Sequence, residues 1–252
     1  MNNNKVVVTG LGVVCPIGHS AKMVLRNLKD QRHNFRHLTE FADFKRSKIS
    51  IGTSIPDFNT NSLQPEDWTC PYPTPLGKET IRGFNPHTFY AYHATREALA
   101  QAKLTDDPLG EETGLFTSSP GSTRNIYHNL NELHAYGVGR TNPFGIINSI
   151  VGTLSWNLSA VFQIQGAGCG FTSACASSAH ALGFAHDQIA LGRQDRVLVT
   201  GAEDGDLFGI LPFAGMRALS TATDPDLASL PFDRRRNGFV GCGGAATLVL
   251  ES

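Results

Sequence analysis

The chain has 252 residues, of which 40% are hydrophobic and 17% charged, so it carries enough apolar side chains for a folded core and is unlike a disordered chain. Its 21 Lys and Arg against 22 Asp and Glu give a formal net charge of -1, which excludes the basic excess that nucleic-acid binding needs. No apolar run reaches the roughly 18 residues of a membrane-spanning helix, and the N-terminus lacks the apolar core of a secretory signal.

The first half of the chain predicts one strand and two helices, separated by an irregular region. Lys5–Thr9 is a β-branched run typical of a buried strand. Ser20 suits the N-cap of a helix over Ala21–Lys29. Residues 30–84 lack periodicity and are rich in proline, which indicates an irregular insertion. An alanine-rich helix is then expected over Pro86–Lys103, with proline in its first turn.

The second half alternates strands with helices. Its predicted elements are a strand at Gly114–Thr117, helices at Asn142–Phe162 and Ala176–Leu191, and strands at Arg196–Thr200, Gly238–Gly244 and Ala245–Glu251. Small residues dominate the second of these helices, which predicts close packing and burial. Strands that alternate with helices predict a mainly parallel sheet with helices on both faces.

One long stretch carries no formal charge. Between Thr141 and His186 there is no Asp, Glu, Lys or Arg, although these residues make up 17% of the chain. Scattered Asn, Ser, Gln and Thr distinguish this stretch from a membrane span. We therefore expect it to lie in a core, an active site or a subunit interface.

Cys175 is the candidate nucleophile among the five cysteines. It lies in Thr172–Ser178, where a strand-like segment turns into a helix, and free amides at a helix start stabilise a thiolate and lower its pKa. Small neighbours leave room for an incoming thioester. The alternative is a buried structural cysteine. The cysteine count is odd and no CxxC pair occurs, so we expect no disulfide framework and no metal site, and a cytoplasmic protein with free thiols.

Two other chemical interpretations are weaker. Gly10 and Gly12 predict a tight turn after the first strand and begin a dinucleotide-binding pattern. Cys15 replaces the third glycine of that pattern, and no acidic residue follows at the expected distance. His180 is displaced by about 140° around the predicted helix from Cys175, so it is not expected to act as a base for that thiol.

Several ordered segments resemble the β-ketoacyl-acyl-carrier-protein synthases, the condensing enzymes of fatty-acid and polyketide synthesis. These segments are Val6–Gly18, Asn142–Gly152, Thr172–Asp204, Phe213–Thr221 and Leu230–Ser252. They resemble the opening strand of the family, its active-site and dimer-contact segment, its nucleophile helix and the segments that close its first half. The resemblance covers nearly the whole chain except about residues 30–84.

The resemblance implies a fold and a site. The fold is thiolase-like: residues 1–252 form one three-layer α/β/α domain with a mixed, mainly parallel sheet, which is one half of the five-layer thiolase fold. Cys175 is implied as the acyl-accepting nucleophile and as the donor of an oxyanion amide. Positions in the acyl pocket or the interface are implied for Gly121, Pro143, Phe144, Ile147, Thr172 and Ala174. The resemblance implies no cofactor and no metal.

The chain also departs from the family. Family proteins are roughly twice as long and have two similar halves, so we expect the C-terminal half to be absent. Its two active-site histidines, its lysine and its glycine-rich phenylalanine loop have no counterpart here. Cys242 stands where the family usually has Asp. Gly121 stands where a bulky gate of the acyl pocket often lies, which predicts a more open pocket.

These departures leave three hypotheses. The first, which the missing histidines favour, is an auxiliary subunit resembling the chain-length factors of type II systems and paired with a full-length ketosynthase. The second is a catalytic half that uses Cys175 with histidines from another chain or from missing sequence, and chain-length factors usually lack that cysteine. The third is a non-catalytic module that binds acyl-carrier protein. None of them condenses substrates on its own.

Overall fold

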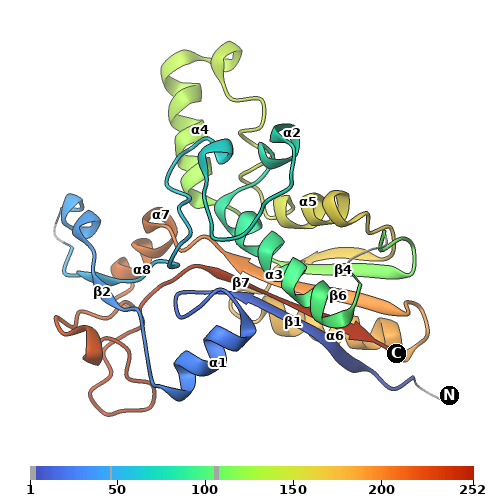
Figure 1. Ribbon diagram of the computed structural model, residues 1–252. Coiled ribbons are helices and arrows are strands. Elements are labelled where there is room, and N and C mark those ends of the chain that lie inside the picture. Colours follow the sequence, from blue (N-terminus) through green and yellow to red (C-terminus); the bar gives the residue numbers. More distant parts are fainter. Residues whose placement is uncertain (1–3, 46, 105–107) are drawn as a thin grey trace.

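A five-stranded sheet organises the chain (Figure 1). The structure is a computed structural model and describes residues 4–45, 47–104 and 108–252. The strand order is β1 (Val7–Val14), β7 (Gly244–Glu251), β6 (Arg196–Glu203), β4 (Thr113–Ser118) and β5 (Gly168–Phe171). β6, β4 and β5 are parallel, and β7 is antiparallel to both of its neighbours, so four of these five strands point the same way. The prediction of a mixed, mainly parallel sheet is confirmed.

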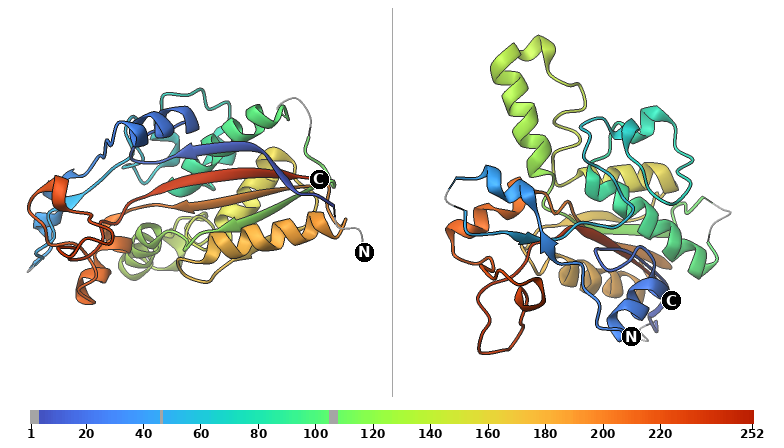
Figure 2. Two further views of the ribbon diagram at one scale, coloured as in Figure 1. Left: turned by 90° about the horizontal axis from the view of Figure 1, so that it is seen from below. Right: turned by 60° about the vertical axis from the view of Figure 1, so that its left-hand side comes forward.

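Helices cover both faces of this sheet. α3 (Pro86–Ala102) packs on β1, β7 and β6, and α6 (Ser177–Ala190) packs on β6 and β4 from the opposite side (Figure 2). α5 (Thr153–Phe162) contacts α3 and β4. Other helices of the described residues are α1 (Ala21–Lys29), α2 (Lys78–Ile81), α4 (Thr123–Tyr136), α7 (Leu207–Ile210) and α8 (Pro212–Gly215). The layers are therefore helix, sheet and helix, as predicted.

Short elements fill the region between α1 and α3. They are the paired strands β2 (Arg36–His37) and β3 (Ile51–Gly52), 3₁₀ turns at Thr39–Asp43 and Pro65–Asp67, and α2. Two more 3₁₀ turns lie at Val138–Arg140 and Pro225–Leu227. Among the described residues, no helix combines the length and apolar character that a membrane crossing requires.

Two hydrophobic cores lie on the two faces of the sheet. Leu115 and Leu198 pack in a core with α3, whereas Phe116 and Val197 pack in a second core with α6. Neighbouring residues of a strand point to opposite faces, so one strand supplies both cores. This explains why apolar residues stand side by side in these strands, at Leu115 and Phe116 of β4 and at residues 197–199 of β6.

The helix starts follow their capping residues. Ser20 accepts a hydrogen bond from the Met23 amide at the start of α1, as predicted. Asn85 caps α3 in the same way through the Thr88 amide, at 2.9 Å, which sequence analysis does not identify. Both caps satisfy amides that a helix leaves unpaired.

The prediction for β1 is wrong in two respects. The strand is Val7–Val14 rather than Lys5–Thr9, and Val8 is 58% exposed because β1 is the outermost strand of the order given above. Gly10 and Gly12 lie inside the strand and not in a turn. The absence of a side chain at these positions lets the main chain of α3 lie directly on the strand.

The helix expected over Asn142–Phe162 is shorter, because only Thr153–Phe162 is α-helical. In residues 142–152, side chains take up main-chain groups that a helix would use for its own hydrogen bonds. Asn142 accepts from the Phe144 amide at 2.9 Å, and Asn129 of α4 donates to the Gly145 carbonyl. The helix α4 itself is not predicted by the sequence.

Two further expectations, for residues 238–244 and for α6, are also wrong. Residues 238–243 form no strand: Phe239 makes a single bridge to Leu219, and Gly238 has a left-handed φ of 137°. β7 is therefore the one strand formed by the closing residues 238–252. The helix α6 is buried on one side only, where Ala181 and Ala185 meet the sheet, while Phe184 is 55% exposed.

Candidate active site

A cavity lies at the carboxyl edge of the parallel strands. Ser119, Thr172 and Asp204 each follow directly after β4, β5 and β6. Carboxyl ends of parallel strands meet at one edge of a sheet, where α/β proteins commonly bind ligands. The cavity has a volume of about 590 Å³ and is lined in part by Ser119, Thr172 and Cys175.

Cys175 lies in the tight turn between β5 and α6. Ala174 before it has φ 52°, a left-handed conformation that is uncommon for a residue with a side chain. Ser177 holds this turn: its hydroxyl accepts from the Ser173 amide at 2.8 Å and donates to the Ala174 carbonyl at 2.7 Å. α6 begins two residues after the exposed Cys175. The turn thus presents a free thiol at a helix start, beside the cavity.

The predicted site residues fall into two groups. Thr172 and Ala174 line the cavity together with Cys175. The interface candidates Pro143, Phe144 and Ile147 lie instead in the turns of residues 142–152, outside the lining of this cavity. Pro143 is exposed, and the other two are half-buried. Their role at an interface stays a prediction.

Gly121 lies where two main-chain segments approach each other closely. Its φ is 79°, and a Cβ there would lie 2.5 Å from the Ser149 carbonyl oxygen. Glycine is therefore needed for the close approach of two main-chain segments. Gly121 is not among the residues that line the Cys175 cavity, and its place in an acyl pocket stays a prediction.

The histidine nearest in sequence to Cys175 contacts a different residue. Nδ1 of His180 lies 2.6 Å from the hydroxyl oxygen of Ser173. Among the described residues, no histidine lines the Cys175 cavity. The site therefore offers a thiol, hydroxyls and main-chain amides, and it offers no imidazole at the thiol.

Two other thiols lie near the cavity. Burial raises the pKa of the half-buried Cys15, which lines the cavity. Cys242 is exposed as a residue, but partial removal of its thiol from water and the nearby Cys15 raise its pKa. Glu203 lines the same cavity, and removal of its carboxyl from water raises its pKa despite the exposure of the residue.

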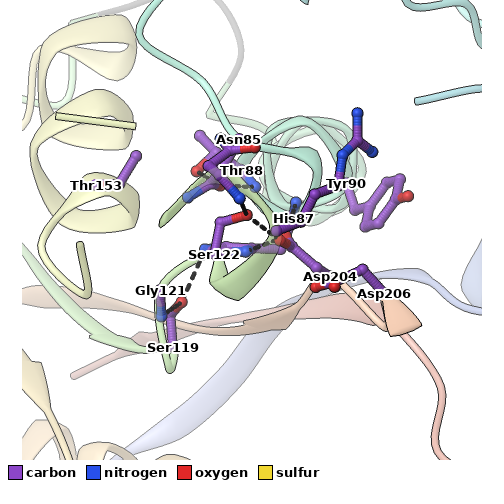
Figure 3. Close-up of polar contacts among 12 residues, drawn as sticks. Asn85, His87, Thr88, Tyr90, Ser119, Gly121, Ser122, Thr153, Asp204 and Asp206 are labelled. Carbon is purple, nitrogen blue, oxygen red and sulfur yellow. Dashed lines mark hydrogen bonds and ion pairs between the residues drawn. The ribbon is translucent and has the colours of Figure 1, made fainter. Parts of the chain in front are cut away.

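The sequence motifs do not include one constellation of residues at this edge. Figure 3 shows that Ser119, His87 and Asp204 converge from three elements. The Ser119 hydroxyl oxygen lies 2.8 Å from Nε2 of His87, and Nδ1 of the same ring contacts a carboxylate oxygen of Asp204. Ser119 and Asp204 directly follow β4 and β6, shortly after the ends predicted for these strands, and this position is the signal that could have identified them.

Comparisons with known proteins identify the family of this chain. Residues 3–252 match the family described as "Beta-ketoacyl synthase, N-terminal domain". The 3-oxoacyl-[acyl-carrier-protein] synthase 1 of Haemophilus influenzae is 30% identical over 98% of this chain, which spans 59% of that protein. A β-ketoacyl synthase crystal structure from Burkholderia phymatum STM815 superimposes with a TM-score of 0.87 at 27% identity, covering all of this chain and 59% of that one.

A second solved structure, the ishigamide ketosynthase/chain length factor, superimposes with a TM-score of 0.80 at 27% identity. The match covers 99% of this chain and 59% of that one. The expected thiolase-like α/β fold is shared with these structures. The match to the family covers residues 3–252, which is nearly all of the chain, and the chain therefore belongs to the β-ketoacyl synthase family through its N-terminal domain.

Proposed function

We propose that this chain takes part in fatty-acid or polyketide chain elongation and that Cys175 accepts the acyl group from a carrier-protein thioester. The observation that carries the proposal is the position of Cys175. Its thiol is exposed in a strained turn at the start of α6, and it opens onto a cavity of about 590 Å³. The printed name of the Haemophilus relative, an acyl-carrier-protein synthase, supports the choice of substrate class.

The acyl transfer needs few groups. The Cys175 thiolate attacks the thioester carbonyl, the bond from sulfur to carbon forms, and the carrier thiol leaves and takes up a proton. The main-chain amide of Cys175 is the expected donor for the oxyanion of the tetrahedral intermediate.

The second step, decarboxylative condensation, develops negative charge on the malonyl thioester oxygen, and hydrogen-bond donors must meet that charge. Among the described residues, the Cys175 cavity contains no histidine that could do so. The proposed function therefore places these donors outside residues 1–252, in a partner chain or in further sequence.

A second candidate function is that of an auxiliary subunit resembling a chain-length factor. The similarity to the ishigamide ketosynthase/chain length factor favours it. The exposed apolar side chains Ile146, Ile150 and Trp156 also favour it, because they lie in the uncharged stretch and suit burial against a full-length ketosynthase. The presence of Cys175 favours the acyl-accepting role instead. A module that only binds acyl-carrier protein remains the third hypothesis.

The test is acyl transfer from a carrier protein that bears a labelled acyl group. The acyl-accepting role predicts label on Cys175, loss of label in Cys175→Ala, and retention in the matched exposed-thiol variant Cys169→Ala. In a complex with a full-length ketosynthase, this role also predicts loss of condensation in Cys175→Ala. Full condensation by that variant would instead identify the auxiliary role. Binding of the carrier protein without acylation or condensation would support the third hypothesis, a module that only binds acyl-carrier protein.

A further inference from the structure

Ser119 stands between two cavities. It follows β4 and lines both the Cys175 cavity and a second cavity of about 360 Å³ beside β5. Its hydroxyl oxygen accepts a hydrogen bond from the Gly121 amide at 3.1 Å and lies 2.8 Å from Nε2 of His87. An amide can only donate, so of these two partners only His87 can accept the hydroxyl proton.

Asp204 determines which ring nitrogen of His87 carries a proton. One carboxylate oxygen contacts Nδ1 of His87 and accepts from its main-chain amide at 2.9 Å, and the other accepts from the Ser122 hydroxyl. Burial alone would raise the pKa of Asp204, but the charge and hydrogen bonds of His87 and the hydrogen bond of Ser122 hold it below its ordinary value. The ionised carboxylate only accepts, so Nδ1 is the nitrogen of His87 that donates to it, and Nε2 is the nitrogen that faces the Ser119 hydroxyl.

These roles are those of a hydrolase triad: a hydroxyl, a base that contacts it and a carboxylate that orients the base. His87 is fully buried, which holds the ring in place, while Ser119 reaches the walls of both cavities. We propose that Ser119, His87 and Asp204 form a second acyl-accepting site, independent of Cys175, that hydrolyses acyl esters and thioesters. Asp204 is a positioning residue, because it acts through His87.

The proposed reaction balances without a further reagent. Ser119 Oγ attacks the acyl carbonyl, its proton passes to Nε2 of His87, and the tetrahedral intermediate expels the alcohol or thiol, which takes up that proton. Water then gives a proton to His87 and attacks the acyl-serine. The bond between carbon and Oγ breaks, the proton returns to Ser119, and a carboxylic acid is released. The Gly121 amide is the main-chain group that donates a hydrogen bond to Oγ of Ser119.

The thioester substrate rests on the proposed function, but ester hydrolysis does not. The test therefore uses the full chain in the assembly in which it purifies, with its thiols first blocked by iodoacetamide. A fluorophosphonate probe is added, and the modified residues are mapped by mass spectrometry. We expect an adduct on Ser119 that forms about 10²-fold more slowly in His87→Gln. Labelling of Ser119 no faster than that of the exposed Ser229 would overturn the proposal, whatever the variants do.

Hydrolysis of p-nitrophenyl butyrate gives a second readout. Ser119→Ala should lower the rate by about 10²-fold or more, while Ser229→Ala, which changes an exposed serine, should keep it. A wild-type rate in folded Ser119→Ala would refute the site. Neither measurement uses a carrier protein or malonyl thioester. Failure here therefore leaves the acylation of Cys175 standing, and failure of that acylation leaves this site standing.

Discussion

Gly12 of β1 lies against the Ala94 carbonyl of α3, so closely that a Cβ on Gly12 would stand 1.8 Å from that oxygen. The atoms it would meet belong to the main chain of a helix, and a helix cannot yield as a flexible side chain does. The spacing between α3 and the sheet therefore depends on the absence of a side chain at this position.

We predict that Gly12→Ala destabilises the chain by about 3 kcal/mol, at the upper end of the range for overpacked cores. Gly183→Ala is the matched control with the opposite sign. A Cβ on Gly183 meets no atom within 4 Å, and alanine favours the interior of a helix by about 1 kcal/mol over glycine. Urea unfolding of both variants measures the two effects. Equal stability of Gly12→Ala and wild type would contradict the close packing described here.

His93 makes stability depend on pH in the mildly acidic range. Burial, with a smaller effect of Arg96, lowers the pKa of His93 to about 4 from 6.5. Between these two values the unfolded chain binds a proton that the folded chain excludes, so stability is complete above about pH 6.5 and falls as the pH drops toward 4. The expected loss between pH 7 and pH 5 is about 2 kcal/mol.

Thermal unfolding at pH 7 and pH 5 checks this prediction. His93→Gln should lose less stability between the two values than wild type does. His186→Gln, which changes an exposed histidine, should follow the wild-type curve. A His93→Gln variant with the full wild-type pH dependence would show that another group is responsible.

Asp204 should stabilise the folded chain most strongly at neutral pH. Its pKa is lowered on folding from an ordinary value of 3.8, so its contribution is present above that value and is lost as the pH falls through the folded pKa. Asp204→Asn removes the carboxylate that accepts hydrogen bonds from His87 and Ser122, which costs about 3 kcal/mol at pH 7. The difference in the free energy of unfolding between Asp204→Asn and wild type should narrow below pH 3.8. Asp187→Asn is the control. It removes an exposed carboxylate that lies 3.2 Å from Nδ1 of His186, and it should change the free energy of unfolding little.

Three of the five thiols should differ in their rate of reaction with limiting iodoacetamide. Removal from water raises the pKa of both Cys15 and Cys242, so less thiolate is present there at neutral pH. Cys175 is exposed at a helix start, and we expect it to be alkylated about tenfold faster than these two. Peptide mapping by mass spectrometry gives the order. Faster modification of Cys15 would argue against an activated thiol at Cys175.

Local signals in the sequence identify the parts of the site that are contiguous in the chain. Small residues follow Cys175, and the β-branched run of β6 follows them, so the position of the thiol before a helix and the buried strand are both predicted. Capping chemistry predicts the start of α1 for the same reason, since Ser20 and the amide that it accepts from are three residues apart. Such interactions need no information from distant segments.

The triad depends on the tertiary structure, because its members lie 32 and 117 residues apart and share no sequence pattern. They meet because β6 pairs with β4 and α3 crosses the same edge. The role of Gly121 is decided in the same way, by the main chain around Ser149 that packs against it. A residue sequence determines hydrophobic periodicity and capping within a few positions. The order of strands in a sheet follows from the burial of all helix and sheet faces at once, and only that packing brings Ser119, His87 and Asp204 together.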